Sequence, residues 1–244
     1  MKHIRNGFTL VEVMLFLAVS GLLLAGVLGM TQSSISSQRF NDATQSFAEF
    51  LRKVYSDVSN PQSIGDGRSD YAIYGKAIVF NNNNDTRVQK ISVYDIIGND
   101  LVSNIGNVKS MLINVGAKIK TNGPADKQVN GLEEEYIPKW GSVIDGIANN
   151  DIPFTGTILV VRRSGTGLID TLVSNESLKG DDGLSSSDEL DKFSERVVDF
   201  CVNMEGYGKE ANLRWDVRIV ENARNTSGIE IIDLDSEDNK CQHP

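Results

Sequence analysis

Apolar residues run almost without interruption through the first part of the chain and then recur with a helical period. Residues 8–30 read FTLVEVMLFLAVSGLLLAGVLGM, in which Glu12 is the one charged residue. Over residues 40–58 apolar side chains return at steps of three and four, which is typical of a helix that buries one face. These patterns predict one nearly continuous helix over residues 9–59, roughly 75 Å long, which Asn60-Pro61 ends.

After residue 61 the pattern becomes that of β-strands. Stretches rich in Val, Ile, Tyr and Phe alternate with Gly, Asn and Asp, which favours strands joined by turns. The predicted strands are Tyr71–Phe80, Arg87–Ile97, Val108–Ile119, Thr157–Arg163, Leu168–Val173, Arg196–Met204, Leu213–Val220 and Ile229–Leu234. The polar run at residues 81–85 predicts a hairpin. Because most connections are too short for helical crossovers, we expect an α+β fold in which a long helix packs on an antiparallel sheet.

Two stretches interrupt the strands. Residues 122–154 contain three of the five prolines and Trp140, and they predict an irregular insertion at a sheet edge, where Trp140 is expected to pack rather than to bind. Residues 179–189 read as an acidic loop. In this loop, Ser187 or Asp188 is expected to cap a short helix over residues 190–193.

The first apolar segment is long enough to cross a bilayer. Residues 8–30 would span roughly 34 Å as a helix, against about 30 Å for a hydrocarbon core. Lys2 and Arg5 precede the segment, which keeps the leader cytoplasmic and exports the rest. A secretory signal peptide is the alternative, but the apolar part of a signal peptide is normally free of charge, and this segment contains Glu12. A carboxylate at bilayer depth costs about 2.5–3.5 kcal/mol, so Glu12 is expected to have a partner. No Lys or Arg between residues 8 and 38 can supply it.

Residues 7–12 read G-F-T-L-V-E after a short basic leader. This pattern resembles the cleavage and methylation motif of type IV prepilins and type II secretion pseudopilins. The resemblance implies that prepilin peptidase cuts between Gly7 and Phe8, that Phe8 becomes N-methylated, and that Glu12 pairs with the new ammonium group on Phe8 of a neighbouring subunit. It also implies a pilin-like fold with a leader at residues 1–7.

The same resemblance divides the rest of the chain into three parts. We expect a transmembrane and filament-core helix at residues 8–30, an amphipathic helix at residues 31–59 and a β-rich globular domain at residues 60–244. The glycines of the first helix allow close packing against other helices or local unwinding. These glycines are Gly21, Gly26 and Gly29.

Composition excludes several functions. The chain has 24 basic and 33 acidic residues, a net charge of −9, so nucleic-acid binding is not expected. His3 and His243 are the only histidines, and no nucleophile elbow or phosphate loop is present. We therefore expect neither catalytic residues nor a cofactor. The arginines at 162, 163, 214, 218 and 224 are expected to pair with acids across strands.

The two cysteines lie in the last fifth of an exported chain, where oxidation is permitted. A bridge between Cys201 and Cys241 would close a loop of about 40 residues and stabilise the fold by roughly 4 kcal/mol in the chain-entropy model. Pilins often close a C-terminal region in this way, so the resemblance supports the bridge, and two separate thiols are the alternative. The acidic residues Asp233, Asp235, Glu237 and Asp238 resemble the calcium-binding C-terminal loop of major pseudopilins, which is the alternative. Because they lack a glycine-centred calcium loop, a solvated acidic end and no metal are expected.

The predicted function is that of a structural, minor-pilin-like subunit of a type IV pilus, serving adhesion, motility or DNA uptake. Cleavage would leave 237 residues of the 244, which is longer than many major pilins and favours a minor subunit. The expected partners are other pilin subunits, prepilin peptidase, and the assembly platform with its ATPase. The chain would lie in the cytoplasmic membrane before assembly and in an extracellular pilus afterwards. A type II secretion pseudopilin, or a membrane-anchored surface binding protein or enzyme, is the alternative.

Overall fold

The computed structural model describes residues 9–60, 71–81, 90–99, 107–119, 134–146, 155–176, 178, 184, 186–204, 215–221, 223–232 and 241. The chain divides into two compact units, residues 1–41 and residues 42–244. Helix α1 (Leu10–Ser59) begins in the first unit and ends in the second. The predicted helix is therefore confirmed, and it ends immediately before Asn60, as the Asn-Pro signal indicated.

In the first unit, α1 exposes its apolar side chains. Leu10, Phe16 and Leu22 are exposed by 74%, 70% and 76%, respectively. No helix within the described part of the chain combines the length and the apolar character that a membrane crossing requires. The span expected over residues 8–30 stays a prediction.

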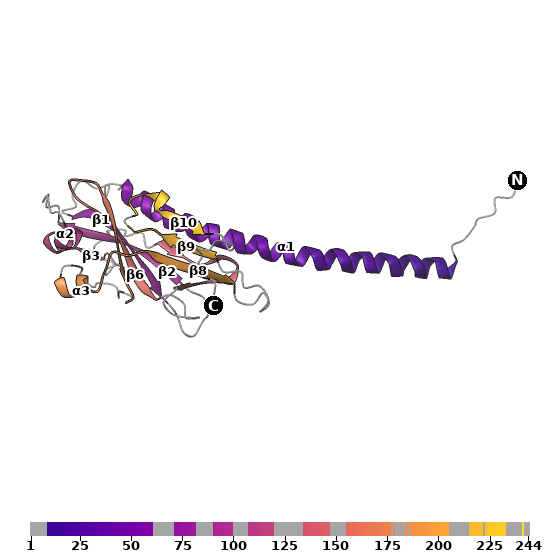
Figure 1. The fold of residues 1–244 in the computed structure, drawn as a ribbon. Helices are drawn as coiled ribbons and strands as arrows, with labels where there is room; N and C mark the ends of the chain where they lie inside the picture. Colours follow the sequence, from indigo (N-terminus) through magenta and orange to yellow (C-terminus); the bar gives the residue numbers. More distant parts are fainter. Residues whose placement is uncertain are drawn as a thin grey trace, which may run out of the picture. The chain divides into compact units, whose positions relative to one another are not determined.

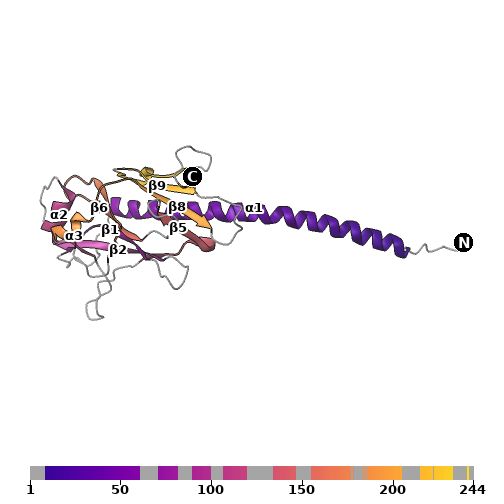
Figure 2. The same ribbon diagram turned by 60° about the horizontal axis from the view of Figure 1, so that its bottom comes forward.

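The second unit contains two antiparallel sheets. One sheet has the strand order β3-β2-β1-β6-β7, with β4 also paired to β2, and the other has the order β10-β9-β8-β5 (Figures 1 and 2). The first sheet is built from β1 (Tyr71–Asn81), β2 (Lys90–Asn99), β3 (Lys118–Ile119), β4 (Glu134–Tyr136), β6 (Gly156–Arg162) and β7 (Ile169–Ser174). The second is built from β5 (Ser142–Gly146), β8 (Val198–Met204), β9 (Trp215–Ile219) and β10 (Ile229–Ile232).

The antiparallel strand pair of the predicted hairpin is confirmed, since β1 and β2 pair from Tyr71 opposite Asn99 to Asn81 opposite Lys90. Residues 82–85 of the predicted turn lie outside the described residues. The register shifts at Gly75, which also lies opposite Val161 of β6. A Cβ atom on Gly75 would lie 2.1 Å from the carbonyl oxygen of Val160. Glycine therefore allows β1 and β6 to approach closely at this irregularity.

The strand predicted over Val108–Ile119 is wrong for most of its length. Residues Val108–Asn114 form helix α2, and only Lys118–Ile119 are in a strand. Asn107 caps the helix, since its side-chain oxygen accepts a hydrogen bond of 2.8 Å from the Lys109 N–H. Val108, Met111 and Leu112 are buried, and their spacing is helical, so the Asn cap and the period together outweigh the β-branched composition.

Two other expectations also need correction. The short helix α3 (Ser187–Asp191) is capped by Ser186, whose Oγ accepts from the Glu189 N–H at 3.3 Å, and not by Ser187 or Asp188. The stretch predicted as an irregular insertion contains β4 and β5, joined by a turn that includes Lys139–Gly141. Because β4 pairs with β2 and β5 with β8, this stretch connects the two sheets.

The six-stranded sheet is covered on both faces within the second unit. On one face the side chains pack with α2 and α3, which lie together in both views (Figures 1 and 2). Members of this cluster include Tyr74, Ile96, Met111, Leu112, Leu159 and Phe193. Ile158 and Val160 of β6 are buried on the opposite face, since successive side chains of a strand point to opposite faces. Double coverage explains why β6 and β7 are buried along almost their whole length.

The part of α1 in the second unit packs among both sheets. The Phe47 ring lies 5.5 Å from the Phe200 ring of β8 and 6.0 Å from the Tyr136 ring of β4, measured between centroids. Arg52 donates a hydrogen bond of 3.0 Å to the Ile229 carbonyl oxygen of β10, which lies alongside this part of α1 in Figure 1. Tyr55 is fully buried, and its hydroxyl lies 2.5 Å from Thr171 Oγ1 of β7. One helix face therefore joins the two sheets.

Replacing Tyr55 by phenylalanine should lower the free energy of unfolding by about 1 kcal/mol near neutral pH, because the Thr171 hydroxyl loses its buried partner. Burial raises the pKa of Tyr55 to about 12, from an ordinary value of 10.0. As the pH rises, the Tyr55 hydroxyl therefore loses its proton in the unfolded state before it does so in the folded state. The contribution of Tyr55 to the free energy of unfolding is complete below pH 10 and declines as the pH rises towards 12. Urea unfolding at pH 8 and pH 11 should show the deficit of the variant shrinking at the higher pH. An equal deficit at both values would contradict the assigned pKa.

Candidate functional site

The N-terminal end of α1 holds the described part of the predicted motif. Thr9 is the N-cap, since its Oγ1 accepts a hydrogen bond of 3.3 Å from the Glu12 N–H. The Thr9 carbonyl oxygen accepts from the N–H groups of Glu12 and Val13 at 3.1 and 3.2 Å. A threonine N-cap followed three residues later by glutamate is the sequence pattern of a capping box. Glu12 thus stands in the first turn, where a carboxylate also interacts favourably with the helix dipole.

Glu12 lies among exposed apolar side chains. It is itself exposed, and its neighbours one helical turn further on, Leu15 and Phe16, are exposed by 65% and 70%. The sequence has no basic residue between Glu12 and Arg39, so a cation for this carboxylate has to come from outside this stretch of helix. Gly7 and Phe8 lie outside the described residues, and their cleavage and methylation stay predictions.

The described glycines of this helical stretch leave open space around them. A Cβ atom added at Gly21 or at Gly26 would meet no atom within 4 Å. Packing within the chain therefore does not require glycine at either position, although each costs about 1 kcal/mol of helix propensity relative to alanine. Close approach of another helix would account for them.

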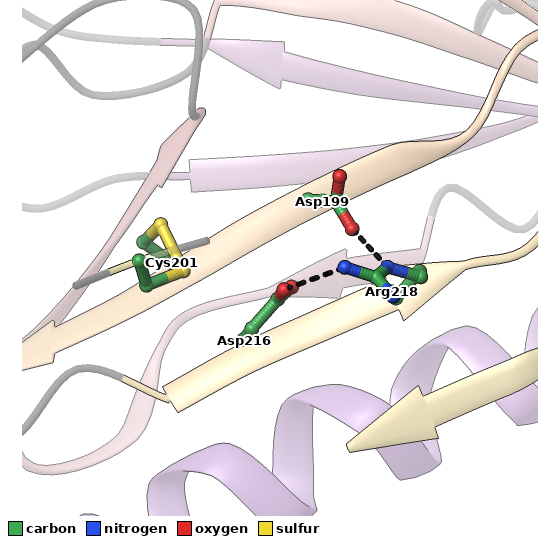
Figure 3. Close-up of a disulfide and its surroundings, with 5 residues drawn as sticks. Asp199, Cys201, Asp216 and Arg218 are labelled. Carbon is green, nitrogen blue, oxygen red and sulfur yellow. Dashed lines mark hydrogen bonds and ion pairs between the residues drawn. A yellow bond between two sulfur atoms is a disulfide. The ribbon is translucent and has the colours of Figure 1, made fainter. Parts of the chain in front are cut away.

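The predicted disulfide is present. Cys201 of β8 is bonded to Cys241, with their Cα atoms 5.4 Å apart and a sequence separation of 40, and both cysteines are buried. The alternative of two separate thiols is therefore wrong. Figure 3 shows the disulfide on β8, beside charged residues of the β8–β9 pair.

Arg218 joins two carboxylates next to the disulfide. Its Nε forms an ion pair with Asp199, which lies directly opposite on β8 (Figure 3). Its Nη2 lies 3.3 Å from Oδ2 of Asp216, which belongs to β9 as Arg218 does. Asp216 lies opposite Cys201 and is fully buried. The cross-strand use predicted for Arg218 is confirmed, and such a buried pair is sensitive to the loss of either partner.

The other predicted charged groups differ in outcome. Arg163 pairs across its hairpin with Asp170, through two hydrogen bonds of 2.5 and 2.7 Å. Hydrogen bonding to Asp170 raises the pKa of Arg163 above its ordinary value. Arg214 and the acids at residues 233–238 lie outside the described residues. Within the described parts of the chain, no group of three or more His, Cys, Asp or Glu residues is placed to hold a metal ion.

Sequence reasoning did not place the turn between β4 and β5 on the surface. Trp140 is 51% exposed and has φ 61° and ψ 22°, and the expectation that it packs rather than binds stays a prediction. It is the one residue other than glycine with positive φ among the described residues. A bulky side chain in this conformation costs on the order of 1–3 kcal/mol. The Trp-Gly pair after Pro138 was the available turn signal.

Comparison with known protein families matches residues 2–28 to the prokaryotic N-terminal methylation motif. The chain matches no curated protein and no solved structure. The motif is typical of structural proteins that begin as membrane-anchored precursors, and it supports a pilin-like or pseudopilin-like role. The motif supports a type IV prepilin-like protein, and the helix that follows it and the antiparallel sheets of the second unit are consistent with a pilin-like fold.

Proposed function

We propose that the chain is a structural, minor-pilin-like subunit of a type IV pilus and that it assembles through the apolar part of α1. The observation that carries this proposal is the exposure of almost every large apolar side chain from Leu10 to Leu24, on a helix whose capped first turn holds a single acid. Monomeric soluble proteins rarely expose such a continuous apolar surface, so it indicates a membrane or other subunits as the surroundings.

The energetics favour burial of this helix. Moving one Leu, Val or Phe side chain from water into apolar surroundings is worth about 1.5–3 kcal/mol. Leu15, Leu17 and Leu23, each exposed by 63–66%, would all gain. Lipid before assembly and neighbouring helices after assembly would each supply this burial. The proposal therefore gives the same surface two successive partners, the cytoplasmic membrane and the other pilin subunits.

Glu12 is proposed to determine how a subunit joins the filament. Cleavage between Gly7 and Phe8 by prepilin peptidase would create an ammonium group at Phe8, and Glu12 of one subunit would pair with Phe8 of the next. In apolar surroundings such a pair is favourable only when both charges are present, so it acts as a device that fixes the register between subunits. An assembly platform with its ATPase would draw the subunit from the membrane into an extracellular filament.

The mass of the N-terminal peptide from sheared surface filaments tests this proposal. The expected peptide begins with N-methylated Phe8, which reports processing, export and assembly together. A chain in which Gly7 is replaced by leucine is the control, because it should stay in the membrane with its leader attached. If the cells carry no filaments and the chain still begins with Met1, the proposal is contradicted and a simple membrane anchor is favoured.

A type II secretion pseudopilin is the second candidate, because the matched motif supports a pseudopilin-like role equally. The two candidates differ in the machinery that they need. A gene for a retraction ATPase beside this one would favour the pilus, and a secretin gene with genes for exported hydrolases would favour secretion.

A further inference from the structure

The disulfide lies on the face of the second sheet that points away from the part of α1 in the second unit. Phe200 of β8 points towards the helix, since its ring centroid lies 5.5 Å from that of Phe47. Successive side chains of a strand point to opposite faces, so Cys201 points away from the helix. Asp216 lies opposite Cys201 on β9 and shares this face. Asp216 is completely buried, and both cysteines are buried as well, so a disulfide and a carboxylate lie side by side with little water around them.

The strand register places acidic residues on both sides of Cys201. Asp216 lies opposite Cys201 on β9, and Asp145 holds the opposite position on β5. Arg218 lies opposite Asp199, two residues beyond Asp216 along β9, which corresponds to about 7 Å. Figure 3 shows the Asp216 carboxylate between the disulfide and the guanidinium group of Arg218. The carboxylate of Asp216 is therefore nearer to Cys201 than the positive charge of Arg218.

The burial of this face strengthens the effect of its charges. Two charges near a protein surface, at an effective dielectric constant of about 20, interact about four times more strongly than in bulk water. On β10, Glu230 lies opposite Arg218 and is exposed, so it adds a further carboxylate at the rim of the same face. A negatively charged group that approaches the disulfide is therefore repelled by Asp216, and salt screens this repulsion only in part.

Thiol–disulfide exchange brings negative charge to the sulfur atoms. The thiolate of a reductant attacks one sulfur of the bridge, the S–S bond breaks, and its electron pair leaves on the other cysteine as a thiolate. A second thiolate of the reductant then displaces the first. The reductant is thereby oxidised to its disulfide, and the two cysteine thiolates take up protons from water. A carboxylate beside the bridge should slow exchange most for thiols with an additional negative charge and least for thiols with a positive charge.

We propose that Asp216 makes the bridge between Cys201 and Cys241 selective for the charge of the thiol that opens it. Because both cysteines are buried, a thiol reaches them when this face opens locally while β8 and β9 stay paired. A protein that exchanges this disulfide should therefore present positive charge around its reactive thiol. The selectivity resides in the second unit, so it goes beyond the proposed structural role and does not depend on filament assembly.

Small thiols of different charge measure this selectivity on the full chain in an uncharged detergent. The thiolate of 2-mercaptoethanesulfonate carries two negative charges, that of 2-mercaptoethanol carries one, and that of cysteamine has no net charge. Loss of the disulfide is followed by alkylation and mass measurement, and each rate constant is expressed per thiolate. The ratio of the cysteamine to the mercaptoethanesulfonate rate constant should be about tenfold higher for the folded chain than for the chain unfolded in urea, because unfolding disperses the charges. Equal ratios in the two states would overturn the proposal.

The Asp216→Asn variant should bring the ratio of the folded chain to within about threefold of the unfolded value, because it removes the charge opposite Cys201 and keeps the size of the side chain. Asp199→Asn is the matched control, since it also takes a carboxylate from Arg218 but leaves the position opposite Cys201 unaltered. It should retain most of the selectivity. If Asp216→Asn speeds the reaction of all three thiols by the same factor, Asp216 only holds the sheet together and the proposal is overturned.

Salt provides a test that needs no substitution and so applies even where the Asp216→Asn chain does not fold. An ionic strength of about 1 M shortens the Debye length to about 3 Å. The ratio measured on the folded, unaltered chain should then fall by at least about twofold towards the unfolded value. A ratio that is the same at low and high salt would exclude an electrostatic cause and overturn the proposal.

Discussion

A chain with Glu12 replaced by alanine should enter filaments at least about tenfold less than the unaltered chain, which corresponds to about 1.4 kcal/mol in the assembly equilibrium. The carboxylate is exposed on an apolar helix whose sequence supplies no cation before Arg39. Without its charge, the ammonium group proposed at Phe8 of the neighbouring subunit would be buried unpaired, and an unpaired buried charge is costly. Comparison of the sheared surface fraction with the membrane fraction on immunoblots measures the effect.

Glu12→Gln separates the two functions that the position could serve. Glutamine can still complete a capping box with Thr9, so the start of the helix should be preserved, but it carries no charge. If assembly depends on the ion pair, Glu12→Gln should fail as Glu12→Ala does, and Glu12→Asp should retain partial assembly. Normal assembly of the glutamine variant would assign Glu12 to helix capping and contradict the pairing.

Replacing Phe47 by alanine should lower the free energy of unfolding of the second unit by about 3–5 kcal/mol, the usual range when a buried aromatic side chain is lost. Phe47 is 1% exposed, and its ring contacts the rings of Phe50, Tyr136 and Phe200. These neighbours belong to α1, β4 and β8, so a cavity at this position would weaken the packing of both sheets against the helix. Urea unfolding followed by circular dichroism, with the chain in detergent, measures the change.

Phe16→Ala is the matched control for this substitution. It removes the same side chain from the same helix, but at a position that is 70% exposed and lies in the first unit. Its effect on the unfolding of the second unit should be within about 0.5 kcal/mol, as for substitutions on a surface. A loss for Phe16→Ala as large as that for Phe47→Ala would show that the aromatic cluster does not cause the effect.

The sequence pattern predicted α1 and seven strand positions because those segments have long, regular periods that tertiary contacts reinforce. It failed at residues 108–114, where Val108, Met111 and Leu112 are compatible with either period and the decisive signal was Asn107 as an N-cap. It also could not predict that the stretch containing β4 and β5 connects two sheets. That arrangement depends on pairing with β2 and β8, which are distant in sequence, and local composition carries little information about such partners.

The candidate site was predictable to a different extent at each end of the chain. Residues 7–12 form a motif of adjacent positions, so the sequence alone made Glu12 a candidate, whose role stays a prediction. The structure added the hydrogen bond that caps the helix at Thr9. The cysteine pair was predictable because the chain has only two cysteines. The ion pairs of Arg218 with Asp199 and Asp216 required the strand register. The exposure of Trp140 required the turn geometry, since composition indicated a packed residue.

The covalent link between Cys201 and Cys241 has a mechanical consequence. Strands β9 and β10 lie inside the closed loop, so tension applied to the two ends of the chain passes through the disulfide and bypasses both strands. When the protein is stretched, the segment that the disulfide closes, with a sequence separation of 40, cannot extend, and about 140 Å of contour length stays hidden at roughly 3.5 Å per residue. A chain built in this way yields less under load than its sequence length implies.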